Sequence, residues 1–169
     1  IEENGLPVLL DFTFAGWGGK FAAEKDNAVN RKLQGAGAFG TTELRTVDLI
    51  LEGGSIESDG QGTLLTTTRC LLNPNRNPHL SREQIEERLK SELGVTNILW
   101  LHHGHLLGDD TDAHIDTLAR LCPDKTIVYV ACDDPADEHF SSLQAMRQEL
   151  EQFSGYRLLP LPWPGAKYD

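Results

Sequence analysis

The sequence predicts an α/β fold built from repeated units of two strands, a helix and a further strand. Two observations support this prediction. The expected elements follow the order strand, strand, helix, strand twice along the chain. Equivalent positions also recur at a nearly constant interval, since Glu52 and His114 lie 62 residues apart and Ile98 and Leu158 lie 60 residues apart. A supersecondary unit that recurs at this interval indicates stacked or radial repeats and disfavours one open doubly wound sheet.

The first half of the chain alternates strands with turns rich in glycine. Residues 6–14 (LPVLLDFTF) predict a strand, because they are apolar with β-branched and aromatic side chains. The expected elements that follow are a short helix at 26–33, a glycine-rich loop at 35–40, a strand at 47–57 that tolerates Gly53-Gly54 in its middle, a turn at 59–62 and a returning strand at 63–68.

The second half repeats this order around two clear helices. Ser81-Arg82-Glu83-Gln84 fits a capping box, and Ile85, Leu89 and Leu93 recur every four residues before Gly94. This pattern predicts a helix over 81–93. The other expected elements are a loop at 73–78, strands at 96–101, 114–121, 126–132 and 156–161, and a helix at 137–153.

Composition indicates a single acidic globular domain, which we expect to span residues 1–169. Hydrophobic residues make up 39% of the chain, and its formal net charge is −11. This charge disfavours a nucleic-acid partner and favours a cationic small molecule. The longest apolar runs are too short to span a bilayer, which predicts no membrane partner. Cys70, Cys122 and Cys132 form an odd set without zinc-site spacing, which indicates a reducing compartment, the cytoplasm.

Two short motifs carry the candidate chemistry. His114 and Asp116 lie two residues apart on an expected strand, so their side chains are expected on the same face. Glu52 precedes Gly53-Gly54, where the backbone can approach a ligand closely. Taken alone, a structural His–Asp hydrogen bond explains His114 and Asp116 as well as a functional role does. In the same way, a β-bulge glycine pair beside an exposed glutamate explains Glu52-Gly53-Gly54 as well as a functional role does. The repeat places Glu52 and His114 at matching positions, which favours one shared site for a planar cation.

Two other kinds of site are weaker alternatives. His102, His103 and His105 lie near several aspartates, but the segment follows a strand and lacks a known zinc spacing, so we expect no metal site there. The cysteines are also poor nucleophile candidates. Cys132, for example, precedes Asp133-Asp134, whose negative charges disfavour a thiolate.

The motifs that occur in order along nearly the whole chain resemble the agmatine deiminase and bacterial-type peptidylarginine deiminase family. They are FAGWGGK at 14–20, LEGGSI at 51–56, DGQGTLLTT at 59–67, NRNP at 75–78 and DDTDAHID at 109–116. The resemblance implies a pentein-like fold, a five-bladed α/β propeller of ββαβ units, of which this chain would be a central part. It also implies hydrolysis of a guanidinium group to a ureido group and ammonia without a cofactor.

In this family a cysteine attacks the guanidinium carbon, a histidine moves protons and carboxylates hold the cation. The resemblance assigns the catalytic histidine to His114 and the catalytic, cation-holding carboxylates to Glu52 and Asp116. It also implies that Trp17 is a further substrate-binding residue. The nucleophilic cysteine of the family lies near the C-terminus and has no counterpart here. We therefore expect this chain alone to be inactive.

The expected substrate is agmatine, which would be converted to N-carbamoylputrescine in polyamine synthesis. Gly16 and Gly18 occupy a region where the peptidylarginine branch has arginines for the substrate carboxylate, which favours a substrate without that group. Ala15, Glu57 and Ala113 depart from the usual pattern. A peptidylarginine or free-arginine deiminase therefore stays an alternative, as do a metal-dependent amidohydrolase and a non-catalytic remnant. Assembly into a homo-oligomer is also left open.

Overall fold

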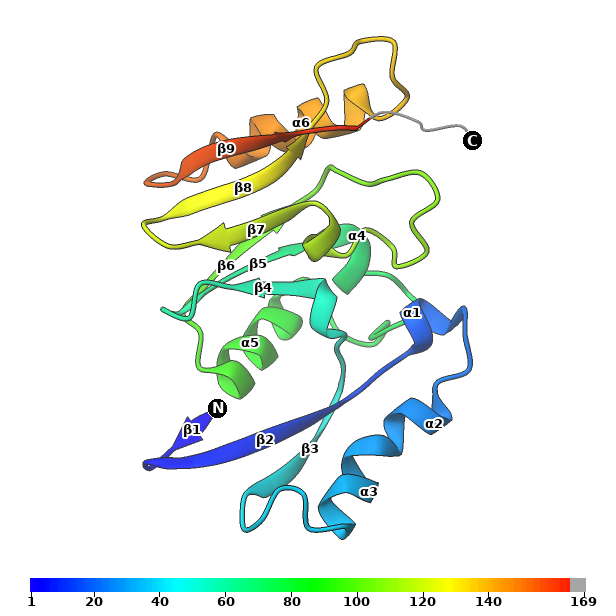
Figure 1. The fold of residues 1–169 in the computed structure, drawn as a ribbon, viewed down its shortest axis with the longest axis vertical. Helices are drawn as coiled ribbons and strands as arrows, with labels where there is room; N and C mark the ends of the chain where they lie inside the picture. The colour runs from blue at the N-terminus through cyan, green and yellow to red at the C-terminus, as the bar shows by residue number, and fades with distance from the viewer. Residues whose placement is uncertain (165–169) are drawn as a thin grey trace.

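The computed structural model describes residues 1–164 and has the expected α/β class. Its strands form three small mixed sheets with the orders β1-β2-β3, β4-β5-β6 and β7-β8-β9. In every sheet the first two strands are antiparallel and the last two are parallel. The three sheets follow one another along the long axis of the molecule, from β2 and β3 at one end to β8 and β9 at the other (Figure 1).

The first unit contains one long parallel pair and three short helices. Its strands are β1 (Glu2–Glu3), β2 (Leu6–Thr13) and β3 (Glu43–Ile50), and its helices are α1 (Gly16–Gly19), α2 (Glu24–Asn27) and α3 (Val29–Gly35). The strand expected at 6–14 is therefore confirmed, whereas the helix expected at 26–33 is two helices that meet at Ala28. The sequence pattern did not predict α1, which is irregular because Trp17 and Gly18 have φ angles of 55° and 80°.

The second unit carries the best-defined helix of the chain. Its elements are β4 (Ile56–Ser58), β5 (Thr63–Thr67), α4 (Thr68–Leu71), α5 (Arg82–Leu93) and β6 (Asn97–Leu101). The predicted capping box is present, because the Gln84 N–H donates to the Ser81 hydroxyl and the Ser81 N–H donates to the Gln84 side chain. Gly94 ends α5 in the left-handed conformation, with φ of 68°.

The third unit follows the same order with one helix between its parallel strands. Its elements are β7 (Ala119–Cys122), β8 (Thr126–Ala131), α6 (Phe140–Leu150) and β9 (Arg157–Pro162). No helix in residues 1–164 is both long enough and apolar enough to cross a membrane.

Two expected strands were wrong in the segments that carry the candidate site. The strand expected at 47–57 ends at Ile50, and Gly53–Ser55 forms a 3₁₀ turn before β4 begins in the next sheet. The strand expected at 114–121 starts only at Ala119, because Ile115–Thr117 is also a 3₁₀ turn. In each case a backbone bond between residues three apart replaces strand pairing: Ser55 donates to Glu52 and Thr117 donates to His114.

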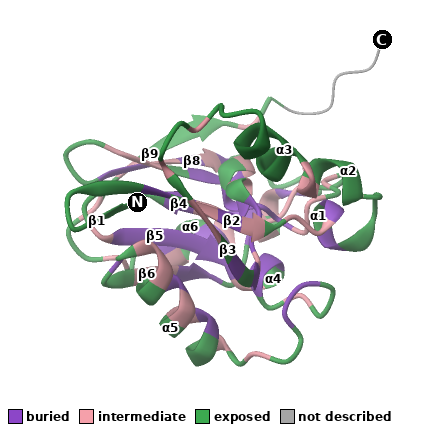
Figure 2. Cartoon of the chain, turned by 90° about the horizontal axis from the view of Figure 1, so that it is seen from below, coloured by how far each residue is buried: buried purple, intermediate pink, exposed green. Residues whose placement is uncertain are grey.

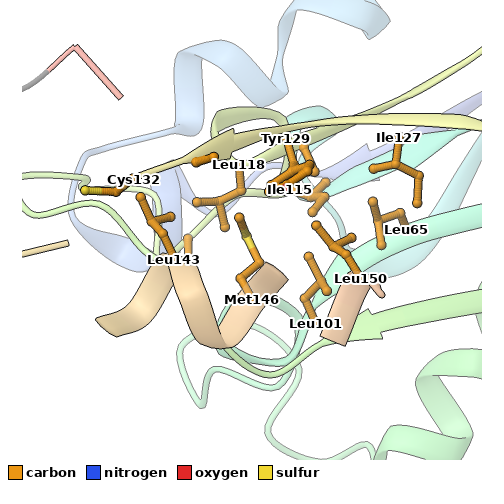
Figure 3. Close-up of a cluster of buried hydrophobic side chains, with 13 residues drawn as sticks. Leu65, Leu101, Ile115, Leu118, Ile127, Tyr129, Cys132, Leu143, Met146 and Leu150 are labelled. Atoms are coloured by element: carbon orange, nitrogen blue, oxygen red, sulfur yellow. The ribbon is translucent and has the colours of Figure 1, made fainter. Parts of the chain in front are cut away.

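The core lies between the sheets and the helices α5 and α6. One cluster joins Leu65 and Leu101 of the second sheet to Ile127 and Tyr129 of β8 and to Met146 of α6 (Figure 3). A second cluster packs β3, β5 and α5 together. Figure 2 shows the buried positions concentrated on the central strands, whereas α2 and α3 bury none of their residues. The middle of the stack, where the site lies, is therefore its best-packed part.

Candidate functional site

Glu52 is held at the junction between the first two sheets. It follows β3 in an extended conformation, and only 3% of the residue is exposed. Its carbonyl oxygen accepts a hydrogen bond of 2.9 Å from the Ser55 N–H, which closes the 3₁₀ turn. The backbone therefore turns sharply directly after Glu52, and its side chain points into the interior.

His114 lies at the corresponding junction between the second and third sheets. The loop before it is braced by Asp109, whose carboxylate accepts hydrogen bonds from the N–H groups of Thr111 (2.9 Å) and Ala113 (2.7 Å). The Thr67 hydroxyl, at the end of β5, donates to the Ala113 carbonyl at 2.7 Å. Asp112 and Ala113 have φ angles of 66° and 63°, so the chain reverses just before His114.

Glu52 and His114 form a buried hydrogen-bonded pair. Glu52 Oε2 and His114 Nε2 are 2.7 Å apart, and only 4% of His114 is exposed. Burial raises the pKa of Glu52, but the hydrogen bonds from His114 and Arg76 outweigh it and hold that pKa below its ordinary value. Because a carboxylate only accepts hydrogen bonds, the proton of this pair lies on Nε2 of His114. The pair can therefore hold or release a proton at a defined atom.

Arg76 is the residue that organises this pair, although the sequence pattern indicated no role for it beyond its place in the NRNP motif. Its side chain is fully buried and donates to Glu52 Oε2 from both Nη2 (2.7 Å) and Nε (3.2 Å). It also donates to Asp112 Oδ2 (2.9 Å) and to the Thr111 carbonyl (3.0 Å). A single guanidinium thus fixes Glu52 and the loop that carries His114.

Lys20 extends this network to the surface. Its ammonium lies 2.7 Å from Asp112 Oδ1, on the opposite side of that carboxylate from Arg76. Burial raises the pKa of Asp112, but the hydrogen bonds from Lys20 and Arg76 outweigh burial and hold that pKa below its ordinary value. Alternating charges therefore run from Lys20 through Asp112 and Arg76 to Glu52.

One carboxylate oxygen of Glu52 has no partner. Oε1 is buried and makes no hydrogen bond to any of the residues that the structure describes. A buried acceptor left unpaired is costly, typically about 1–3 kcal/mol or more when it is charged. The arrangement therefore leaves one oxygen available to a donor from a ligand.

Gly54 brings Asp116 to the same place as His114. A Cβ atom added to Gly54 would lie 2.5 Å from Asp116 Oδ2 and 2.6 Å from His114 Nδ1. Only glycine leaves room for both side chains at this point. The structure thus places Asp116 beside His114, as expected, but it does so through a 3₁₀ turn and not through strand alternation. Asp116 is exposed, in contrast to its two companions.

Trp17 lies at a separate pocket that Glu52 also lines. The pocket has a volume of about 420 Å³, and its lining residues include Asp11, Asp26 and Glu52 together with the aromatic residues Phe14 and Trp17. The Trp17 ring is fixed edge-on between Phe14 and Phe21, with centroids 5.0 and 5.5 Å away. Carboxylates beside aromatic faces favour a cationic ligand.

One group of side chains has the composition of a metal site. The ligand atoms of Glu52, Cys70 and His114 lie within 4.8 Å of one another, and this is the only such group among residues 1–164. His102, His103 and His105 are not part of this group. His103 pairs instead with Glu149 at 2.8 Å, and His105 with the Ser142 hydroxyl at 3.0 Å.

Comparison with known proteins identifies relatives of this chain. The family described as Porphyromonas-type peptidyl-arginine deiminase matches residues 3–169. Agmatine deiminase of Stutzerimonas stutzeri is 41% identical over 157 residues, which cover 90% of this chain and 42% of that protein. Agmatine deiminase of Pseudomonas aeruginosa is 38% identical over 178 residues, covering 99% and 48%.

A solved structure agrees with this relationship. The structure of a cysteine-to-serine variant of C. jejuni agmatine deiminase with substrate bound matches with a TM-score of 0.92 and 50% identity, covering 98% of this chain and 49% of that one. The chain thus spans about half the length of the relatives it matches. On its sequence and its fold, the chain belongs to the Porphyromonas-type peptidyl-arginine deiminase family.

Proposed function

We propose that the protein to which this chain belongs hydrolyses the guanidinium group of agmatine to a ureido group and ammonia. The observation that carries the proposal is the buried Glu52–His114 pair, in which Glu52 keeps one oxygen unpaired. A guanidinium presents planar N–H donors that match such an oxygen. The curated relatives named agmatine deiminase support this choice of substrate.

The residues of this chain supply binding and proton transfer. Glu52 Oε1 would accept one guanidinium N–H and Asp116 a second, while Arg76 keeps Oε2 in place. His114 would move protons. A cysteine from outside this chain would supply the nucleophile: its thiolate adds to the guanidinium carbon, and ammonia leaves with a proton from His114. Water then adds to the same carbon and the carbon–sulfur bond breaks, which releases the ureido product and the cysteine thiolate. Of the two protons set free, one returns to His114 and one goes to solvent.

The Trp17 pocket offers a place for the cationic remainder of the substrate. Agmatine carries an ammonium at its far end, and the pocket contains Asp11 and Asp26 as well as Glu52. Asp11 is itself buried and accepts a hydrogen bond of 2.7 Å from Asn30. No lysine or arginine lines this pocket within residues 1–164, so its lining offers a substrate carboxylate no cationic partner. This favours agmatine over free arginine.

We further propose that residues 1–169 are the central part of one deiminase domain with a propeller arrangement. Three successive units share the same strand pairing. Apolar side chains are exposed to solvent at both ends of the stack: the exposed fraction is 67% for Leu6 and about half for Leu159 and Leu161. Further units of a longer chain would cover these faces. The relatives also support a cationic small-molecule substrate. The proposal of a cytoplasmic location rests on the three free cysteines, and assembly into a homo-oligomer stays open.

The test is product analysis with the full-length protein. Agmatine, free arginine and an arginine-containing peptide should be assayed in parallel for ammonia and for the ureido product. The proposal predicts the highest kcat/KM for agmatine. Preference for the peptide or for arginine would assign the protein to the alternative deiminase reaction. Activity that depends on an added metal ion would support an amidohydrolase, and no activity on any of the three would support a non-catalytic remnant.

A further inference from the structure

Cys70 lies beside the Glu52–His114 pair but has no part in the proposed reaction. Its sulfur, a ring nitrogen of His114 and a carboxylate oxygen of Glu52 lie within 4.8 Å of one another. The three residues come from different segments: Cys70 lies in α4, Glu52 in the short segment after β3 and His114 in the loop before β7. None of them is more than 4% exposed.

Cys70 is fixed relative to His114 through Thr67. The Thr67 hydroxyl accepts the N–H of Cys70 at 3.1 Å and donates to the Ala113 carbonyl at 2.7 Å. The sulfur is therefore held in position by the residue that also holds the His114 loop. Burial raises the pKa of the Cys70 thiol to about 12, so the sulfur is protonated when no metal ion is bound.

The donor set is that of a borderline-soft divalent ion. Thiolate sulfur, imidazole nitrogen and carboxylate oxygen together are typical ligands of Zn²⁺, whereas Mg²⁺ and Ca²⁺ prefer oxygen alone. The unpaired Oε1 of Glu52 is a second, independent observation, because it is a buried acceptor without a partner among the described residues. Glu52 also lines the Trp17 pocket, so one of the three residues borders a cavity.

We propose that Cys70, His114 and Glu52 form an inhibitory binding site for Zn²⁺ or a chemically similar ion. Binding breaks the S–H bond of Cys70 and releases that proton to solvent, and bonds form from Sγ, Nε2 and Oε1 to the ion. The proton on Nε2 of His114 moves to Nδ1, which faces Asp116 across Gly54. No electron is transferred.

The charge of Arg76 does not prevent this arrangement. Arg76 bonds to Oε2 of Glu52 and to Asp112, and both contacts can persist when Oε1 binds an ion. The Cys70 thiolate, Glu52 and Asp112 together carry three negative charges, which balance the two charges of the ion and the one of Arg76. The bound ion then occupies the groups that would bind guanidinium and move protons. The inhibition, unlike the binding, rests on the proposed function.

The first test is a Co²⁺ titration of the full-length protein. Wild type should bind Co²⁺ with a thiolate-to-metal charge-transfer band in the near ultraviolet. Cys70→Ser should lose this band, whereas Cys122→Ser and Cys132→Ser should retain it. Zn²⁺ affinity in Cys70→Ser should fall by at least about 100-fold. Loss of a residue that only orients a metal ligand typically costs no more than about 100-fold, so a larger loss indicates direct ligation. A band that survives Cys70→Ser, or that is absent from wild type, would overturn the proposal.

X-ray absorption by Zn²⁺ bound to wild type gives a readout that needs no variant. We expect one sulfur at about 2.3 Å and nitrogen or oxygen ligands at about 2.0–2.1 Å. A shell without sulfur would contradict the site. Ammonia release from agmatine is measured separately. Zn²⁺ should inhibit the wild type reversibly, whereas Cys70→Ser should retain activity and show no inhibition by Zn²⁺. Co²⁺ binding at Cys70 in a protein that does not hydrolyse agmatine would uphold the metal site and refute the proposed function.

Discussion

Glu52 and His114 lie 62 residues apart in the chain, yet their side chains share a buried hydrogen bond of 2.7 Å. Each residue directly precedes a 3₁₀ turn, and each turn lies at a junction between two successive sheets. The repeat of the fold thus places the two candidate side chains in equivalent positions, from which they contact each other. The chemistry proposed for this protein depends on that contact.

Replacing the carboxylate of this pair should remove activity. We expect Glu52→Gln in the full-length protein to lower kcat/KM for agmatine by at least about 100-fold, because proton transfer and cation binding both depend on the charge. Steady-state ammonia release measures this effect. Glu57→Gln is the matched control, since Glu57 is also buried and pairs with an arginine, Arg120, at 2.7 Å. Equal losses in the two variants would show that the effect is structural.

The glycine pair allows a steric test of the position of Asp116 and His114. A methyl group at Gly54 would meet both side chains at 2.5–2.6 Å, whereas nothing lies within 4 Å of the same atom at Gly53. We expect Gly54→Ala to lower kcat/KM by about 100-fold, the effect of moving a reacting group by about 1 Å. Gly53→Ala should change kcat/KM only slightly. Retained activity in Gly54→Ala would mean that Asp116 and His114 are not needed in this arrangement.

Arg76 should contribute strongly to stability. Arg76→Gln leaves the buried carboxylate of Glu52 without its main cationic partner, which typically costs about 3–5 kcal/mol. Urea unfolding would measure the change in the free energy of unfolding. Arg45→Gln, which breaks ion pairs with Glu3 and Glu43 at the surface, should leave the unfolding midpoint near that of wild type. A small change in Arg76→Gln would show that Glu52 finds another partner.

Stability should depend on pH through the carboxylates around Arg76. Burial raises the pKa values of Glu52 and Asp112, but their hydrogen bonds outweigh burial and lower both below the ordinary values of 4.5 and 3.8. A carboxyl with a lowered pKa in the folded state stabilises the fold above its unfolded pKa. This stabilisation is lost as the pH falls through the folded value. We therefore expect the free energy of unfolding to decrease below pH 4.5.

Urea unfolding at a series of pH values would test this dependence. Asp112→Asn should unfold more easily than wild type at neutral pH but lose less stability on acidification, because one of the responsible groups is gone. An equally steep decrease in the variant and in wild type would assign the pH dependence to other groups.

The repeat and the proximity of Glu52 and His114 were predicted better from the sequence than the backbone conformation around these two residues. Hydrophobic patterning located β2, β5, β6, β8 and α5 within one or two residues, because each packs a regular apolar face. It extended strands through Glu52 and His114, because a 3₁₀ turn of three residues leaves no periodic pattern. The α4 helix was missed for the same reason.

The supporting residues could not be predicted from the sequence in the same way. Arg76 contacts Glu52 and Asp112 from 24 and 36 residues away, and neither spacing corresponds to a local motif. Cys70 approaches Glu52 and His114 only because Thr67 connects α4 to the His114 loop. The one local signal was the Asn75-Arg76-Asn77 motif, in which Asn77 is also buried and bonds both backbone groups of Ile50.

The proposed division of roles is tested most directly by comparing the 169-residue chain with the full-length protein in the presence of agmatine. Binding should be followed by calorimetry and turnover by ammonia release. We expect the isolated chain to bind agmatine weakly through Glu52 and Asp116 but to release no ammonia, whereas the full-length protein releases it. Comparable ammonia release by the isolated chain would refute these roles, since it would place the nucleophile among Cys70, Cys122 and Cys132 or show that none is required.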